Sequence, residues 1–186
     1  MKTSTTTRKL TTLAMLAALS VILVALVHIP FPPAPFLEYD PADVPIFIGT
    51  FLYGPAAGLG LTLVVSVIQG TTVSAGSGII GIVMHLLSTG TFVVLSGSLY
   101  RKYHNRLGAA VALVVGVLSM TLVMVGCNLV FTPIFMGQPV EEVIGMLMPV
   151  IIPFNLLKAG INGLVTYLVY KPIGRLLRAE RSPQAV

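Results

Sequence analysis

The sequence Phe51-Leu52-Tyr53-Gly54-Pro55-Ala56-Ala57-Gly58 decides how many helices this chain forms. It interrupts an apolar run from Val44 to Gln69, and glycine can end one helix where proline can start the next. A break at Gly54 and Pro55 predicts two helices, of which the first is short. A single kinked helix is the alternative, and it lowers the number of helices by one.

The composition indicates a membrane protein. Of the 186 residues, 9% are charged and 55% are hydrophobic, and the mean hydropathy is +0.95. Soluble domains carry about 25% charged residues, so this chain could not cover its surface with polar groups. An ordinary cytosolic enzyme, a nucleic-acid binder and a disordered chain are thereby excluded. The single cysteine, Cys127, rules out an internal disulfide and is interpreted as a small buried hydrophobe.

The positions of the basic residues set the helix count. A bilayer core requires about 20 apolar helical residues per crossing, and basic residues prefer the cytoplasmic side. Basic clusters stand at 2–9, 101–106 and 171–181. They share one side only if the run from Val44 to Gln69 forms two helices. The sequence therefore predicts an all-α integral membrane protein with six transmembrane helices, at about 10–29, 42–54, 55–69, 78–100, 107–131 and 148–171.

This topology places both termini in the cytoplasm and the connections 30–43, 70–78 and 132–149 outside. Five of the 6 acidic residues lie in these outer connections, namely Glu38, Asp40, Asp43, Glu141 and Glu142. A single membrane domain is expected over 1–178, followed by a polar tail at 179–186. The segment Met1 to Ile29 also resembles a secretory signal, but its apolar run is long and no convincing cleavage site follows. A retained first helix is the favoured interpretation.

The outer connection 30–43 is rich in proline and aromatic residues. Five of the chain's 13 prolines fall within it, and proline fixes φ and removes a backbone donor, so a stiff, extended segment is expected. One interpretation is a lid in which Phe31, Phe36 and Tyr39 close over an apolar ligand. The other is a rigid spacer, with Asp40 or Asp43 capping the next helix.

Lys158 is the most unusual residue of the predicted spans. A cation inside a spanning segment usually faces a cavity, a partner or a substrate path. Asn155 and Asn162 lie on the same helix face, which favours a polar site. The alternative is a lysine that extends to the outer interface. Asn128 and Thr132 lie at the outer end of the preceding helix and could face the same cavity, although a lone intramembrane asparagine often only joins helices.

Other features are weaker when taken alone. His85 is expected to be a satisfied histidine between helices without a carboxylate partner, which disfavours proton coupling. The segment 70–78 is interpreted either as a flexible Gly/Ser turn or as a segment that approaches a ligand closely. Ala14 and Ala18 permit close helix packing. No phosphate-binding loop, zinc helix or Cys-x-x-Cys pair occurs, so ATP-driven work would require another subunit.

In combination, these motifs resemble the substrate-binding S components of the energy-coupling factor (ECF) transporters, specifically the riboflavin type. The resemblance covers nearly the whole chain. It is carried by Pro35 to Pro45, Phe51 to Gly58, Asn128 to Pro133 and Asn155 to Lys158, with the alanine pair of the first helix.

The resemblance implies a membrane subunit that captures a vitamin outside and joins one transmembrane coupling subunit and two ATPase subunits. Riboflavin would be the transported ligand, with no cofactor, no metal and no catalytic residue. Asn128, Asn155 and Lys158, with Thr132 nearby, would bind the polar edge of the isoalloxazine ring, which is rich in acceptors. Further ligand contacts are implied for Leu37, Glu38, Tyr39 and Met84. Ala14 and Ala18 would dock onto the coupling subunit.

Two classes of function remain open at this point. The first is a riboflavin-binding transport subunit in the cell membrane, or the same architecture for thiamine or FMN. The second is a membrane enzyme or an assembly subunit without a ligand. An enzyme should gather several titratable groups at one depth, and the sequence places only Lys158 and His85 inside the membrane.

Overall fold

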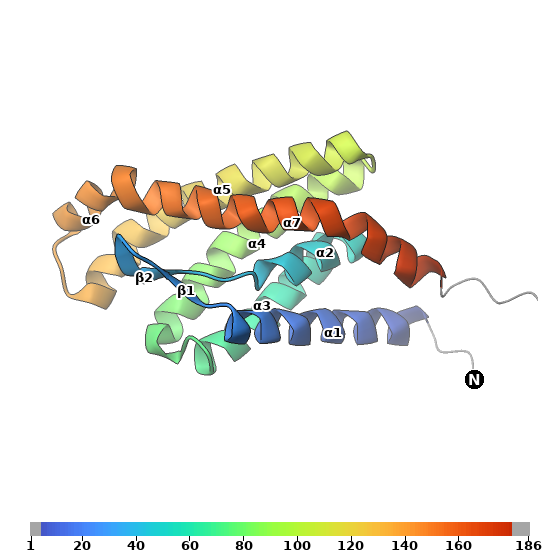
Figure 1. Cartoon of the computed structure of the whole chain (residues 1–186), viewed down its shortest axis with the longest axis horizontal. Coiled ribbons are helices and arrows are strands. Elements are labelled where there is room, and N and C mark those ends of the chain that lie inside the picture. The colour runs from blue at the N-terminus through green and yellow to red at the C-terminus, as the bar shows by residue number, and fades with distance from the viewer. Residues whose placement is uncertain (1–4, 180–186) are drawn as a thin grey trace, which may run out of the picture.

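The computed structural model describes residues 5–179, and these form a helical bundle with a small hairpin at one end (Figure 1). In chain order the elements are α1 (Thr5–Leu26), β1 (Ile29–Phe31), β2 (Ala34–Tyr39), α2 (Asp43–Tyr53), α3 (Pro55–Thr71), the 3-10 turn η1 (Ala75–Ser77), α4 (Gly78–Lys102), α5 (Arg106–Met136), α6 (Val140–Met146), the π-helical segment η2 (Leu147–Ile151) and α7 (Ile152–Ala179). Apart from its first residue, the polar tail predicted at 179–186 lies outside the described residues.

The start of α1 and the end of α7 lie at the same end of the bundle, and the hairpin and α6 lie at the opposite end (Figure 1). We call these the terminal end and the hairpin end. Because the described chain begins and ends at the terminal end, it runs along the bundle an even number of times. The distribution of the basic residues predicts this arrangement.

The predicted break between α2 and α3 is confirmed. Helix α2 ends at Tyr53, and Gly54 follows with a φ of 90°, a left-handed conformation that glycine adopts without strain. The Gly54 amide donates to the Thr50 carbonyl at 2.8 Å, and Pro55 is the first residue of α3. Proline fits there because its missing N–H would have no partner inside the helix.

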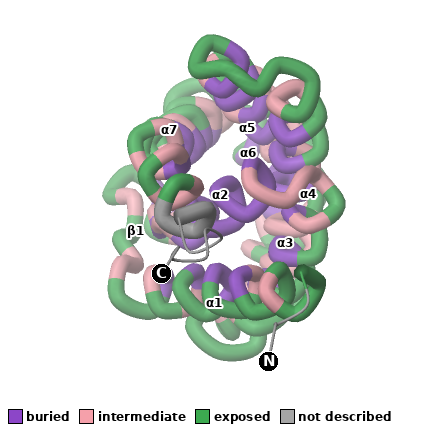
Figure 2. Tube along the Cα trace, turned by 90° about the vertical axis from the view of Figure 1, so that its right-hand side faces the viewer, coloured by how far each residue is buried: buried purple, intermediate pink, exposed green. Residues whose placement is uncertain are grey.

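Helix α2 is short because it does not face the outside of the bundle. All of its residues from Asp43 to Phe51 are buried, and α1, α3, α4 and α7 surround it. Viewed from the terminal end, the buried face of each neighbour turns inward toward α2 (Figure 2). A helix that is apolar all round is stable only when other elements cover it, and here four helices do so.

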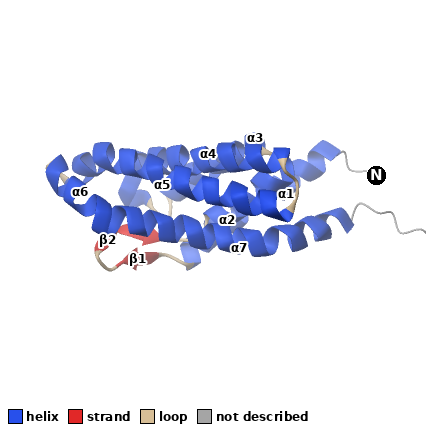
Figure 3. Ribbon diagram, turned by 90° about the horizontal axis from the view of Figure 1, so that it is seen from above, coloured by secondary structure: helices blue, strands red, loops and turns tan. Residues whose placement is uncertain are grey.

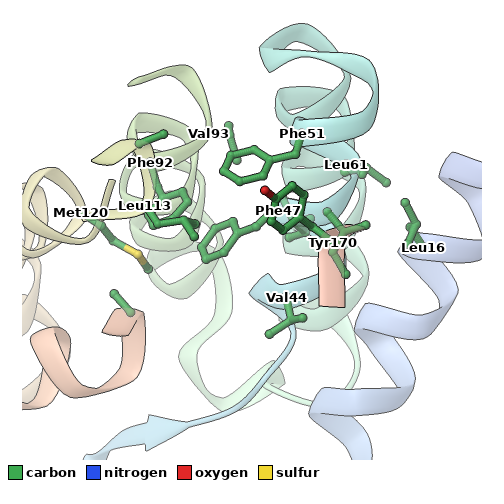
Figure 4. Close-up of a cluster of buried hydrophobic side chains, with 14 of the residues drawn as sticks. Leu16, Val44, Phe47, Phe51, Leu61, Phe92, Val93, Leu113, Met120 and Tyr170 are labelled. Carbon is green, nitrogen blue, oxygen red and sulfur yellow. The ribbon is translucent and has the colours of Figure 1, made fainter. Parts of the chain in front are cut away.

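Stacked aromatic rings join α2 to its neighbours in the core (Figure 4). Phe47 of α2 and Phe92 of α4 stack with centroids 3.6 Å apart and planes 8° apart. A Cβ at Gly116 of α5 would lie 2.7 Å from the Phe92 ring. Glycine at 116 therefore allows α5 to approach this stack closely.

The outer surface of the bundle is apolar. Large hydrophobic side chains are exposed on all the long helices, for example Met15 at 68% and Leu122 at 73%. In the described part of the chain, four helical segments are long and apolar enough to cross a membrane: Thr5–Leu26, Ala75–Lys102, Arg106–Met136 and Val140–Arg175. The shorter apolar helices are α2 and α3. This is the surface of a multi-pass membrane protein.

The connections at the hairpin end are more ordered than the sequence indicates. The proline-rich connection forms an antiparallel hairpin that pairs Ile29 with Tyr39 and Pro30 with Glu38. Its prolines are tolerated because each strand of a two-stranded sheet has a free edge. The segment predicted as a connection from 132 to 149 is largely helical: α5 continues to Met136, and α6 and η2 follow.

Candidate functional site

The hairpin packs against the start of α7 and against α6 (Figure 3). Ala34 and Leu37 of the hairpin are buried with Phe154 of α7 in one apolar cluster. Phe31 contacts Phe154 with ring centroids 5.2 Å apart. The hairpin is therefore a cover that lies on the bundle through apolar contacts, in agreement with the lid interpretation.

Asn162 fastens the end of the hairpin to α7. Its Nδ2 donates to the Asp40 carbonyl at 3.0 Å, and its Oδ1 accepts from the Tyr39 hydroxyl at 3.2 Å. Partial burial and the nearby Asp40 carboxylate raise the pKa of the Tyr39 phenol. Because the phenol keeps its proton, it remains a donor to Asn162.

Lys158 turns toward the hairpin rather than outward along the helix. Its Nζ donates to Asp40 Oδ2 at 2.7 Å and to the Glu38 carbonyl at 3.1 Å. The lysine side chain is 19% exposed and the Asp40 side chain 7%. Both partners belong to the hairpin segment and its junction with α2, so the ammonium group lies in a polar cluster at the hairpin end.

A cavity of about 180 Å³ lies under the hairpin, between α3, α4, α5 and α7. Among the residues predicted to bind the ligand, six line it: Leu37, Glu38, Met84, Asn128, Thr132 and Lys158. Gly70, Ser74 and Ser77 of the glycine-rich segment line it as well. Residues separated by more than 100 positions thus meet around one cavity.

Two of these residues retain unused donors. An ammonium group has three N–H bonds, and within the described chain two of those of Lys158 are taken up by Asp40 and Glu38. Asn128 donates one N–H to the Met124 carbonyl at 2.8 Å, and its oxygen accepts from Thr132 at 2.8 Å. One N–H on each of Lys158 and Asn128 remains for a ligand that presents acceptors.

Tyr39 and Asn155 lie beside the cavity but do not line it. Tyr39 is held by Asn162, as described above. Asn155 is buried, and its Nδ2 donates to the Ile151 carbonyl at 2.8 Å, where η2 passes into α7. The ligand contact expected for these two residues stays a prediction.

The prediction that His85 lacks a carboxylate partner is wrong. His85 lines the cavity, and its Nε2 lies 3.0 Å from Asp43 Oδ1. The sequence places Asp43 in an outer connection, but in the structure it is the first residue of α2 and only 1% exposed. Asp43 also does not cap its helix, because its carboxylate faces α4 and accepts from Thr89 at 2.9 Å. Asp40 Oδ1 accepts from the Ala42 amide at 3.0 Å, just before α2 begins.

Some cavity residues were not identified from the sequence. His28 pairs with Glu38 at the hairpin edge, and Ser66 and Gln69 of α3 form part of the wall. Serine and glutamine are common enough in membrane helices that only the fold distinguishes these two. The described residues contain no cluster of His, Cys, Asp and Glu suited to a metal ion.

Ala14 and Ala18 lie on the exposed face of α1. They stand beside exposed apolar side chains, including Met15. Within residues 5–179 no other element covers this face, so it is open to another membrane helix.

With this geometry established, comparison with known proteins gives the family. The model of the family described as "ECF transporter, substrate-specific component" matches residues 8–170. The chain belongs to this family.

Individual relatives match over almost their whole length. The riboflavin transporter FmnP of Bacillus subtilis is 28% identical over 184 residues, which cover 94% of this chain and 96% of that protein. The riboflavin transporter RibU of Streptococcus thermophilus is also 28% identical, over 93% of this chain and 86% of the relative.

A solved structure, described as the S component of a bacterial ECF transporter, superposes with a TM-score of 0.78 at 26% identity. The match covers 91% of this chain and 96% of that one. The fold is therefore that of an ECF S component, and the family membership confirms the prediction of a transport subunit rather than an enzyme.

Proposed function

We propose that this protein captures riboflavin from the outside and delivers it inward together with an ATP-driven energy-coupling module. The observation that carries the proposal is the covered cavity, where the Lys158 ammonium and the Asn128 amide each hold a donor in reserve. The relatives that match over nearly the full chain are named as riboflavin transporters, which supports a flavin as the ligand.

The proposed topology has six transmembrane helices within one domain, 1–178, and both termini in the cytoplasm. The four long apolar segments supply four crossings, and α2 and α3 together supply the short pair. The hairpin end then faces outward, which agrees with its acidic residues and with the basic residues at the terminal end.

Within the cavity, Lys158 and Asn128 would donate to acceptors on the pyrimidine edge of the isoalloxazine ring, and the Thr132 oxygen would accept. Leu37, Glu38 and Met84 would enclose the ligand. Asn155 would hold the first turn of α7 in place, and Tyr39 would keep the hairpin closed through Asn162.

Ligand entry requires the cavity to widen. A volume of about 180 Å³ is below the range of about 300–1,000 Å³ typical of ligand pockets. The hairpin is joined to the bundle by apolar contacts and a few hydrogen bonds, so a shift of the hairpin and of neighbouring side chains can supply the space.

The partners proposed for delivery are one transmembrane coupling subunit and two ATPase subunits. Ala14 and Ala18 are proposed to contact the coupling subunit, because their exposed face allows a partner helix to approach closely. Riboflavin is the transported ligand in this scheme and not a cofactor.

The test is ligand binding by the purified protein in detergent or nanodiscs. Riboflavin fluorescence should be quenched on titration, and FMN and thiamine added as competitors should identify the preferred ligand. No binding at micromolar riboflavin would refute the proposal. If thiamine but not FMN competed, thiamine would become the proposed ligand of the same transport architecture.

A further inference from the structure

A network of polar side chains lies between α2, α3 and α4, and two of its members, His85 and Ser66, line the cavity. Its centre is the His85 ring of α4. The ring's Nε2 lies 3.0 Å from Asp43 Oδ1 and its Nδ1 lies 3.0 Å from Ser66 Oγ.

The contacts of Ser66 favour a hydrogen bond in which it accepts from the ring. A serine hydroxyl has a single proton, and the Ser66 hydroxyl donates to the Thr62 carbonyl of its own helix at 2.6 Å. With the Ser66 proton directed at Thr62, the Ser66 oxygen accepts, and in this arrangement His85 Nδ1 carries a hydrogen.

Asp43 likewise accepts from the ring. Its Oδ1 receives the Thr89 hydroxyl at 2.9 Å in addition to His85 Nε2. An ionised carboxylate has only acceptors, so Nε2 must also carry a hydrogen. A histidine with hydrogens on both ring nitrogens is an imidazolium cation.

Among the described residues, His85 is the charged group in direct contact with Asp43. Lys158 of α7 is bonded to Asp40, and Glu38 pairs with His28. Apart from these side chains on α7 and the hairpin segment, the described residues that line the cavity from α3, α4 and α5 carry no charged or titratable group other than His85. An unpaired carboxylate in the membrane interior would be costly.

Asp40 and Asp43 are three positions apart at the point where the hairpin leads into α2. Asp40 joins this junction to α7 through Lys158, and Asp43 joins it to α4 through His85. The junction is therefore held to two different helices by two ion pairs.

We propose that His85 is a positioning residue for flavin binding: as an imidazolium paired with Asp43, it fixes the hairpin–α2 junction over the cavity. This proposal rests on the proposed function for its binding readout. Its charge state can be tested without a ligand.

The first experiment is NMR of the full-length protein in nanodiscs, with histidine labelled by the NMR-active nitrogen isotope. The three histidines are His28, His85 and His104, and His85→Gln identifies the His85 signals. At neutral pH both His85 nitrogens should show the shifts of protonated nitrogens. One nitrogen with the shift of an unprotonated imidazole would overturn the proposal.

The second experiment is a double-mutant cycle read by riboflavin affinity. His85→Gln and Asp43→Asn should each weaken binding by about tenfold or more, because each leaves its former partner without a matching charge. The double variant replaces the ion pair by a neutral amide pair and should return to within about threefold of wild type.

His104→Gln, at the exposed terminal end, is the matched control and should bind as wild type does. If the double variant binds riboflavin no more tightly than the single variant with the lower affinity, the ion pair is not the unit that positions the junction. Failure of the wild-type protein to bind riboflavin would refute the proposed function instead, and the NMR result would still decide the charge of His85.

Discussion

Replacement of Lys158 by methionine is the sharpest test of the cavity. Methionine keeps the length and the apolar stem but removes the ammonium group. The variant loses the bonds to Asp40 Oδ2 and to the Glu38 carbonyl, which measure 2.7 and 3.1 Å. It also loses the third N–H, which we propose to serve the flavin.

The expected magnitude follows from these contacts. A hydrogen bond to a charged group contributes about 1.5–3 kcal/mol, so loss of the flavin bond should weaken affinity by about 10- to 150-fold. Removal of one member of a buried ion pair costs about 3–5 kcal/mol, so the variant should also melt at a lower temperature. The pair is largely shielded, with side chains 19% and 7% exposed, and screening by solvent is accordingly small.

The double variant Asp40→Asn with Lys158→Met separates the two effects. It removes the unpaired carboxylate and should recover most of the thermal stability, whereas the affinity measured by riboflavin fluorescence should stay low. Wild-type affinity in Lys158→Met would refute the site. Full recovery of affinity in the double variant would show that Lys158 acts only through Asp40.

Three further outcomes are expected. Ala14→Leu with Ala18→Leu should leave riboflavin binding unchanged but abolish uptake in cells that hold the coupling module, because leucine side chains keep a partner helix at a distance. Gly54→Ala should lower the free energy of unfolding by about 1–2 kcal/mol, because alanine is strained at a φ of 90°; thermal melting measures this. Asn162→Leu removes two bonds of about 1 kcal/mol each between α7 and the hairpin, and should speed riboflavin release by about 30-fold in stopped-flow experiments.

Each outcome has a matched control. Ala56→Leu places the same side chain on an exposed position of α3, and uptake should continue; equal loss in both variants would argue against an α1 interface. Gly60→Ala also adds a Cβ in open space but within a helix, so it should not destabilise. Thr166→Val removes a hydroxyl that donates to the Asn162 carbonyl. If this variant released riboflavin as fast as Asn162→Leu does, the bonds between Asn162 and the hairpin would not be what slows release.

The sequence predicted structure correctly at positions where the residue type has a single physical explanation. Gly54 and Pro55 predicted the helix break, and the basic residues predicted that the described chain begins and ends at the same end of the bundle. Lys158 was singled out because a charge in an apolar run needs a partner, and the structure supplies Asp40.

The sequence was uninformative where the reason lies in a neighbour that only the fold brings close. Asp43 follows a proline-rich segment and looks like a loop residue, but the tight junction into α2 buries it against His85, 42 positions later. The strands of the hairpin are hidden by their prolines, because the same residues that usually break sheets are tolerated at its free edges. Ser66 and Gln69 have no local signal, since polar residues of this kind also occur between membrane helices for packing alone.

The short helix α2 also fixes how far apart two cavities of the bundle lie. Eleven residues span about 16 Å, roughly half of a bilayer core of about 30 Å. The cavity under the hairpin lies at one end of this helix, and a second cavity of about 430 Å³, lined by Gly54, Tyr100 and Arg101, opens at its other end. The two cavities are thus separated along the bundle by a buried helix about half as long as the membrane is deep.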